Sequence, residues 1–218
     1  MKIKEVVSHL ENVLTTQQVG TDASHDIHHA RRVHRNAVEI AATEEATNEV
    51  ILAASAYLHD LVNLPKNAPN RHEASRLSAE AAIPILQDMD FNQADIEAIT
   101  HCISAHSFSA AIEPTTTNAK VLQDADRLES VGALGIARTF YIAGKMDSDL
   151  FHAADPFAAN RTLNDKQYAV DHFRVKLLGL ADTMQTHSGK TIAKQRTRSM
   201  LAFLNQLASE LDCQQPWQ

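Results

Sequence analysis

Histidine and aspartate occur in three segments of the sequence at positions where apolar residues would be expected. His29 lies in the first segment, the dipeptide His59-Asp60 ends an apolar run in the second, and Asp124 lies in the third. Burying an imidazole or a carboxylate costs free energy unless the group is paired or coordinated. A divalent metal ion bound by two imidazoles and two carboxylates would satisfy all four side chains. The pattern therefore predicts a metal centre with ligands from three helices.

The third segment, Asp124-Ala125-Asp126, offers two carboxylates for one ligand position. Asp124 lies three residues after Val121 and four before Leu128, on or near the helix face that these apolar residues bury. We therefore expect Asp124 to be the ligand. Asp126 falls on a different face, where it could accept a hydrogen bond from a ligand histidine. Ligation by Asp126 instead of Asp124 stays open as the alternative.

Helices must carry these side chains, because the apolar positions recur with a 3.6-residue period and no stretch alternates like a strand. The run before His59 is apolar on nearly all sides from Val50 onward, which predicts a central, buried helix. A fourth helix is expected to be interrupted or bent at Pro84. We expect a loop over 145–163 and helices over about 3–18, 26–46, 48–62, 72–89, 92–106, 119–131, 132–144, 164–187 and 190–211.

The composition excludes several classes of protein. Hydrophobic residues make up 44% and charged residues 22% of the 218 residues, which argues against intrinsic disorder. No window approaches 18 uninterrupted apolar residues and no secretory signal is recognisable, so neither a membrane span nor export is expected. The net charge of -7 argues against nucleic acid as a partner. Two cysteines form no disulfide framework and fit the cytoplasm, where we expect the protein.

The three segments together resemble the HD superfamily of metal-dependent phosphohydrolases. The family's order is a His, a His-Asp dipeptide and an Asp, which match His29 (followed by Arg32 and Val33), His59-Asp60 and Asp124. Further stretches are similar to the stand-alone bacterial members of the YedJ-like branch, over about residues 8–211. These stretches are Ala105–Ser109, Gln123–Glu129, Asp155–Phe157, Asp171–Phe173 and Lys176–Leu178.

The resemblance implies an all-α fold, an HD-domain helical bundle with a C-terminal helical extension. We expect a single domain over 1–218, with a core over about 20–135 and the extension or lid over 145–218. The long C-terminal helices could pack on the core or on a second subunit, so a homo-oligomer stays open.

The resemblance also implies the chemistry of a phosphohydrolase. A divalent ion would activate a bound water, and the resulting metal-bound hydroxide would attack phosphorus. Asp60 is both a ligand and a candidate proton acceptor. His106 could donate to a substrate phosphate or protonate the leaving oxygen, although a loop histidine held by packing is an equal alternative. His101 and His106 are five residues apart, which on an ideal helix points them about 140° apart, so we expect one ion.

Cations should surround the negative charge of the transition state, and four basic residues are candidates for substrate binding. A solvated surface charge is the alternative for each of them. The candidates are Lys66 and Arg71 after the dipeptide, Arg32 one turn from His29, and Lys176 in the C-terminal region.

The expected substrate is a small nucleotide, and the resemblance favours release of pyrophosphate from nucleoside triphosphates. The alternatives are a nucleoside monophosphate phosphatase or other phosphoesterase, and a non-catalytic nucleotide-binding sensor. Mixed imidazole and carboxylate ligation suits several ions. We expect Mn first, with Ni, Co, Fe, Zn or Mg as the alternatives.

Overall fold

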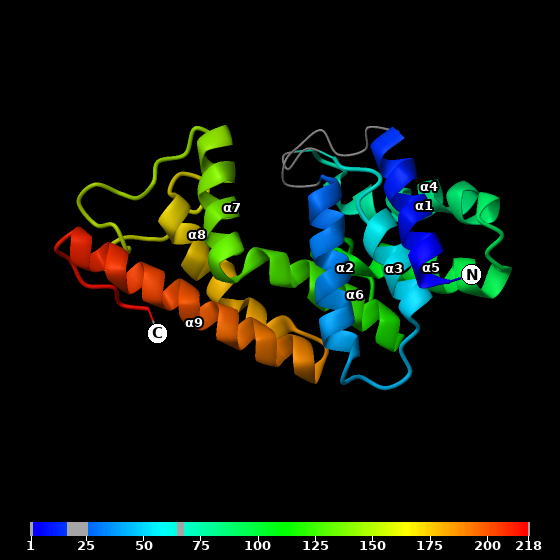
Figure 1. Cartoon of the computed structure of the whole chain (residues 1–218). Helices are drawn as coiled ribbons and strands as arrows, with labels where there is room; N and C mark the ends of the chain where they lie inside the picture. Colours follow the sequence, from blue (N-terminus) through cyan, green and yellow to red (C-terminus); the bar gives the residue numbers. More distant parts are fainter. Residues whose placement is uncertain (1, 17–25, 65–67, 218) are drawn as a thin grey trace. The chain divides into compact units, whose positions relative to one another are not determined.

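The protein is all-α in the computed structural model, which describes residues 2–16, 26–64 and 68–217 (Figure 1). These described residues form helices and connecting segments and contain no strand, which confirms the expected fold class. None of the described helices is long and apolar enough to cross a membrane. The helices are α1 (Ile3–Thr16), α2 (Ile27–Ala41), α3 (Glu49–Leu58), α4 (Ala74–Asp88), α5 (Gln93–His106), α6 (Thr117–Arg127), α7 (Gly132–Lys145), α8 (Ala169–Val175) and α9 (His187–Glu210).

The chain divides into two compact units, residues 1–126 and 127–218. We expected the C-terminal extension to begin at 145, but α7 packs against α9 and so belongs to the second unit. Residues 127–135, which we placed in the HD-type core, also lie in that unit. The assignment of the whole chain to a single domain stays a prediction.

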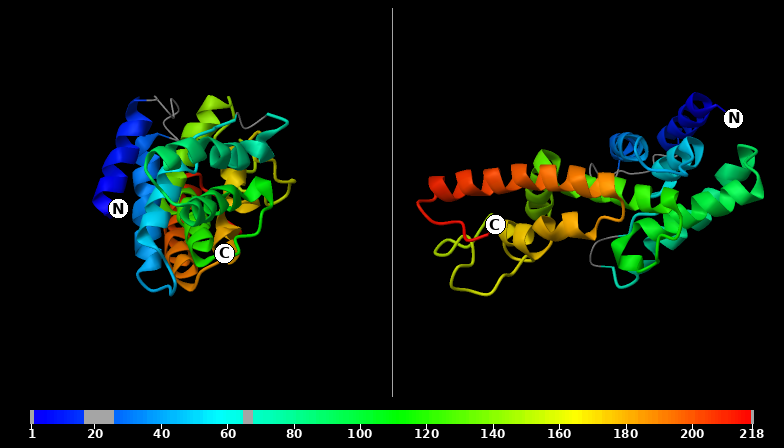
Figure 2. Two further views of the ribbon diagram at one scale, coloured as in Figure 1. Left: turned by 90° about the vertical axis from the view of Figure 1, so that its right-hand side faces the viewer. Right: turned by 90° about the horizontal axis from the view of Figure 1, so that it is seen from below.

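Helix α3 is the centre of the first unit. Every residue from Ile51 to Leu58 is buried, and α3 contacts α1, α2, α4 and α5. Figures 1 and 2 show α1, α2 and α3 side by side. The helix begins at a defined point because the Asn48 side chain accepts hydrogen bonds from the backbone N–H groups of Val50 and Ile51. The expected central, buried helix is therefore confirmed.

Helix α4 differs from the expectation in two respects. It is continuous through Pro84, so the expected interruption is absent, and a bend there stays a prediction. The loss of one backbone hydrogen bond at proline is tolerated here because α4 packs along α5 and buries Ala79, Ala82 and Leu86. The helix also begins at Ala74, after a short 3₁₀ helix over Arg71–Glu73.

The second unit is built around aromatic side chains. The ring of Phe140 on α7 lies 6.0 Å from Phe173 on α8 and 5.9 Å from Phe203 on α9, measured between centroids. The helix expected over 164–187 is wrong in its extent. It is replaced by α8 and a 3₁₀ helix over Leu177–Thr183. A single turn forms at Asn164, where the Tyr168 N–H donates to the Asn164 carbonyl, but the chain then pairs with Asp149, and α8 begins only at Ala169.

Candidate metal centre

Five side chains of the first unit bring their nitrogen and oxygen atoms to one place. His29, His59 and Asp126 have ligand atoms that all lie within 4.8 Å of one another, and so do His59, Asp60 and His106. The two groups share His59. We call these five residues the His/Asp cluster. Its histidines are buried, whereas the side chains of Asp60 and Asp126 keep 25% and 31% of their surface exposed, which leaves an approach from solvent.

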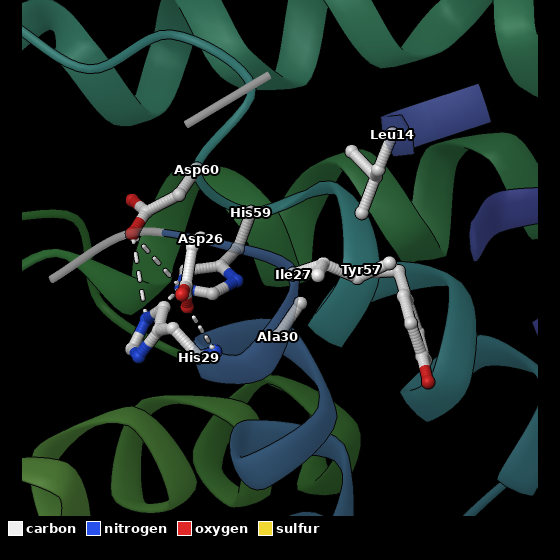
Figure 3. A pocket seen from close by; sticks show the side chains of 8 residues that line it. All are labelled: Leu14, Asp26, Ile27, His29, Ala30, Tyr57, His59 and Asp60. Atoms are coloured by element: carbon white, nitrogen blue, oxygen red, sulfur yellow. Dashed lines mark hydrogen bonds and ion pairs between the residues drawn. The ribbon is translucent and has the colours of Figure 1, made fainter. Parts of the chain in front are cut away.

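The imidazole nitrogens and carboxylate oxygens of the cluster lie within ion-pair distance of one another. His29 Nε2 lies 3.5 Å from Asp60 Oδ2 and 3.5 Å from Asp126 Oδ1. His59 Nε2 lies 3.3 Å from Asp60 Oδ2, and His106 Nε2 lies 3.8 Å from Asp60 Oδ1. Figure 3 shows His29, His59 and Asp60 converging at one end of a pocket that apolar side chains line elsewhere.

Three helices end at the cluster. His59 is the residue after α3, His106 is the last residue of α5, and Asp126 lies in the last turn of α6. The aligned peptide dipoles of a helix give its C-terminus a partial negative charge, which favours a cation nearby. His29 comes from the first turn of α2, where the Asp26 side chain accepts a hydrogen bond from its backbone N–H. This cap fixes the start of α2 and the position of His29.

Hydrogen bonds fix the orientation of two imidazole rings. His59 Nδ1 lies 2.9 Å from the Ala56 carbonyl oxygen, and His106 Nδ1 lies 2.6 Å from that of Ile103. A carbonyl oxygen only accepts, so each Nδ1 carries the hydrogen. In a neutral ring, Nε2 then presents its lone pair to the cluster. This is the arrangement by which proteins prepare a histidine for metal binding.

The carboxylates of the His/Asp cluster stabilise positive charge at its centre. Burial opposes protonation of His59, but the carboxylates of Asp60 and Asp126 outweigh it and raise the pKa of His59 to about 9. Burial and the neighbouring His59 lower the pKa of His106. Burial would raise the pKa of Asp126, but the histidines around it prevail and lower that pKa. The donor set of imidazole nitrogens and carboxylate oxygens therefore fits a divalent cation.

Comparison with known proteins assigns the family. The family model for the HD domain matches residues 26–131, which contain the whole cluster. The Bacillus subtilis protein YpgQ is 31% identical over 212 residues, which cover 95% of this chain and 93% of YpgQ. The chain belongs to the HD-domain family. Its assignment to the YedJ-like branch stays a prediction.

Solved structures of HD-domain proteins agree with this fold over nearly the whole chain. An HD-superfamily hydrolase from Bacillus thuringiensis has a TM-score of 0.72 at 27% identity, with 97% of both chains covered. The crystal structure of Bacillus subtilis YpgQ in complex with ADP has a TM-score of 0.71 at 29% identity. It covers 96% of this chain and 97% of YpgQ. The HD-domain match and these relatives support the assignment of this chain as a metal-dependent hydrolase.

The structure brings together most of the ligands that we expected in this HD-domain chain, but it exchanges the last carboxylate. His29, His59 and Asp60 lie in the cluster, and Asp126 is there in place of Asp124. Asp124 is fully buried, as is Val121 one turn earlier. Asp124 therefore lies on the core face of α6, as its apolar neighbours in the sequence predict. The cluster instead forms around the partly exposed carboxylate of Asp126 in the last turn, and which of the two acids binds a metal ion stays a prediction.

His106 and His101, which were not expected to be metal ligands, lie in different places. His106 lies in the cluster, beside Asp60. His101 lies outside it, because its Nε2 accepts a hydrogen bond from the backbone N–H of Thr115 at 3.1 Å and contacts the hydroxyl of that residue. The two histidines thus have different surroundings.

The four basic residues expected to bind substrate lie in different surroundings. The Arg71 guanidinium donates to the Leu64 carbonyl oxygen, in the segment that follows the dipeptide. Arg32 is half-buried on α2, one turn after His29. Lys66 lies outside the described residues, and Lys176 is an exposed residue of the second unit. Their contacts with substrate stay predictions.

Two buried amides next to the cluster were not identified from the sequence. Asn36 Nδ2 donates to the Ala125 carbonyl oxygen at 3.1 Å, and Gln123 Nε2 donates to that of Ala105 at 2.7 Å. Asn36 is seven residues after His29, which places both on one face of α2. A polar amide within the apolar pattern of a helix was the signal that could have identified them.

Proposed function

We propose that this chain is a metal-dependent phosphohydrolase acting on small nucleotides, and specifically that it releases pyrophosphate from nucleoside triphosphates. The observation that carries the proposal is the His/Asp cluster, with its imidazole nitrogens and carboxylate oxygens at the ends of three helices. The nucleotide class is supported by the ADP complex of YpgQ, which is 29% identical to this chain. The release of pyrophosphate is proposed because the sequence motifs resemble those of stand-alone HD hydrolases.

The residues that would hold the ion are His29, His59, Asp60 and Asp126. A divalent ion bound there supplies Lewis acidity, which polarises a phosphoryl oxygen and lowers the pKa of water. Manganese is our first expectation, and Ni, Co, Fe, Zn and Mg are the alternatives. One ion per chain remains our prediction.

Asp60 has a different neighbour for each of its oxygens. Its Oδ2 faces His29 and His59, whereas its Oδ1 faces His106 Nε2 at 3.8 Å. One carboxylate can therefore act as a ligand through one oxygen and receive a proton from the attacking water on the other.

His106 is the second group able to move a proton. Its Nδ1 is committed to the Ile103 carbonyl, so proton exchange takes place at Nε2, on the side of Asp60. The pair can pass the proton from water to the leaving oxygen of the substrate. Arg71, Arg32, Lys66 and Lys176 are proposed to bind the phosphates.

A turnover assay on the Mn(II)-loaded protein tests this function. Nucleoside mono-, di- and triphosphates are supplied in turn, and pyrophosphate and orthophosphate are measured separately. We expect pyrophosphate from triphosphates, and its loss in Asp60→Ala. Orthophosphate from monophosphates would replace the proposal with a nucleoside monophosphate phosphatase. Saturable nucleotide binding without turnover would replace it with a sensor.

A further inference from the structure

Two buried side-chain amides each bind the peptide carbonyl directly before a residue of the His/Asp cluster. Asn36 donates from α2 to the carbonyl of Ala125, and the next residue is Asp126. Gln123 donates from α6 to the carbonyl of Ala105, and the next residue is His106. Asn36 keeps 1% and Gln123 keeps 3% of its surface exposed, so water does not compete for these hydrogen bonds.

The carbonyl of Ala105 needs a partner because α5 ends one residue later. The last four carbonyls of a helix have no N–H group of their own helix to accept from. Three consecutive carbonyls at this end are bound by side chains. Ile103 is bound by His106 Nδ1 at 2.6 Å, Ser104 by Ser75 Oγ at 3.0 Å and Ala105 by Gln123 at 2.7 Å. The Gln123 bond is the one that acts on the peptide leading into His106.

The two amides connect the helices of the cluster in series. Asn36 joins α2 to α6, and Gln123 joins α6 to α5. Each of these helices carries a cluster residue: His29 on α2, Asp126 on α6 and His106 on α5. Fixing the peptide plane before a residue limits the directions in which its side chain can point, and ligand atoms tolerate little displacement.

We propose that Asn36 and Gln123 are positioning residues, Asn36 for the carboxylate of Asp126 and Gln123 for the imidazole of His106. The proposal rests on the proposed metal-dependent function, because it assigns the two residues to different parts of that site. Asn36 acts on a ligand, so its loss weakens metal binding. Gln123 acts on the proton-transferring group, so its loss slows the reaction but does not change the affinity for the metal.

Binding of Mn(II) alone, measured by calorimetric titration, tests the role of Asn36. Asn36→Leu and Asn36→Asp both remove the N–H donor at nearly constant size, and whichever variant folds by circular dichroism is used. We expect a loss of about tenfold or more in Mn(II) affinity, the range found when groups behind metal ligands are removed. Affinity equal to that of the wild type would overturn the role of Asn36.

Ser75→Ala is the matched control. Ser75 is buried and makes the same kind of bond to a carbonyl at the end of α5, but Ser104 does not directly precede a cluster residue. We expect this variant to bind Mn(II) like the wild type, even where its melting temperature falls. A loss of affinity equal to that of the Asn36 variants would show that general destabilisation is the cause and would overturn the proposal.

Gln123→Met tests the second role by steady-state kinetics at saturating Mn(II). We expect unchanged Mn(II) affinity, a fall in kcat of about tenfold and little change in KM. An unchanged kcat, or a loss of kcat together with Mn(II) affinity, would overturn the role of Gln123. The two proposals fail differently: a wild-type chain that binds no Mn(II) refutes the metal centre, whereas equal binding by the wild type and the Asn36 variants refutes positioning.

Discussion

The Nε2 atoms of His29 and His59 lie 3.2 Å apart, within hydrogen-bond distance. In neutral His59 the hydrogen is on Nδ1, which donates to the Ala56 carbonyl, so its Nε2 lone pair faces the other ring. Two carboxylates, Asp60 and Asp126, lie within 3.5 Å of His29 Nε2. A cation placed between these side chains would be stabilised by both imidazole nitrogens and by both carboxylates. The same four groups would be the ligands of a divalent ion.

Addition of metal should therefore stabilise the folded chain. A ligand that binds only the folded state stabilises it by about 2.7 kcal/mol at a hundredfold excess over its Kd, which corresponds to roughly 5–10 °C in Tm for a chain of this size. We expect Mn(II) to raise Tm by this order, and EDTA to reverse the change. Differential scanning calorimetry measures it. In His59→Ala the shift should vanish, and a full shift in that variant would contradict the assignment of the site.

Substitution of the two acidic residues of α6 should affect different properties, metal binding for Asp126 and folding stability for Asp124. Asp126→Asn should reduce Mn(II) affinity and turnover by at least tenfold, because Asp126 lies in the cluster. Asp124→Asn should act mainly on folding, because the Asp124 side chain is fully buried. Metal titration together with chemical denaturation separates the two effects. Loss of metal binding in Asp124→Asn, at an unchanged free energy of unfolding and with Asp126→Asn unaffected, would restore Asp124 as the ligand.

This exchange of acids shows how far the sequence could predict the site. The periodicity of apolar residues reports which face of a helix is buried, and on that basis it identified α3 as central and Asp124 as buried. The cluster, however, forms where the ends of several helices meet. Which side chain of the last turn of α6 points there depends on the packing of helices far apart in sequence, and no local pattern contains that information.

The extent of α8 has a similar explanation. The amphipathic pattern over 164–187 is helical, but the chain pairs with Asp149 next to Tyr168: the Asp149 N–H donates to the Gln167 carbonyl, and the Asp149 carbonyl accepts from the Ala169 N–H. Such a contact cannot be recognised from periodicity, because it joins backbone groups that are far apart in the sequence. The sequence therefore predicted the helical class well and the ends of this helix poorly.

The ion pair between Glu11 on α1 and Arg31 on α2 should make stability depend on pH. Arg31 donates two hydrogen bonds to Glu11, at 2.7 and 2.9 Å, and Tyr57 donates a third at 2.8 Å. The hydrogen bond from Arg31 is the main cause that lowers the pKa of Glu11, against the opposing effect of burial. A lowered pKa in the folded state stabilises above the unfolded value of 4.5, and this stabilisation is lost as pH falls through the folded pKa.

Arg31→Met should accordingly lower the free energy of unfolding at pH 7 by about 0.5–1 kcal/mol, since the pair is partly exposed and screened by solvent. At pH 3 the difference from the wild type should shrink towards zero. Urea denaturation at the two pH values measures both quantities. Arg35→Met, at an exposed arginine of the same helix, is the control. A difference that stays constant between the two pH values would exclude the ion pair as its cause.

The buried ion pair of Arg161 and Asp171 should contribute more to the free energy of unfolding than the partly exposed pair of Glu11 and Arg31. Asp171 is fully buried, and both of its oxygens accept from the Arg161 guanidinium, at 2.6 and 2.7 Å. Arg161→Met leaves a buried carboxylate without its cation, which costs roughly 3–5 kcal/mol. Asp165→Asn is the matched control, because its half-exposed pair with His172 is worth about 1 kcal/mol or less. Denaturation followed by the fluorescence of Trp217, which packs on Phe157 in this unit, reports the loss. Equal, small effects of the two variants would show that the backbone N–H of Asn164 alone suffices to hold Asp171.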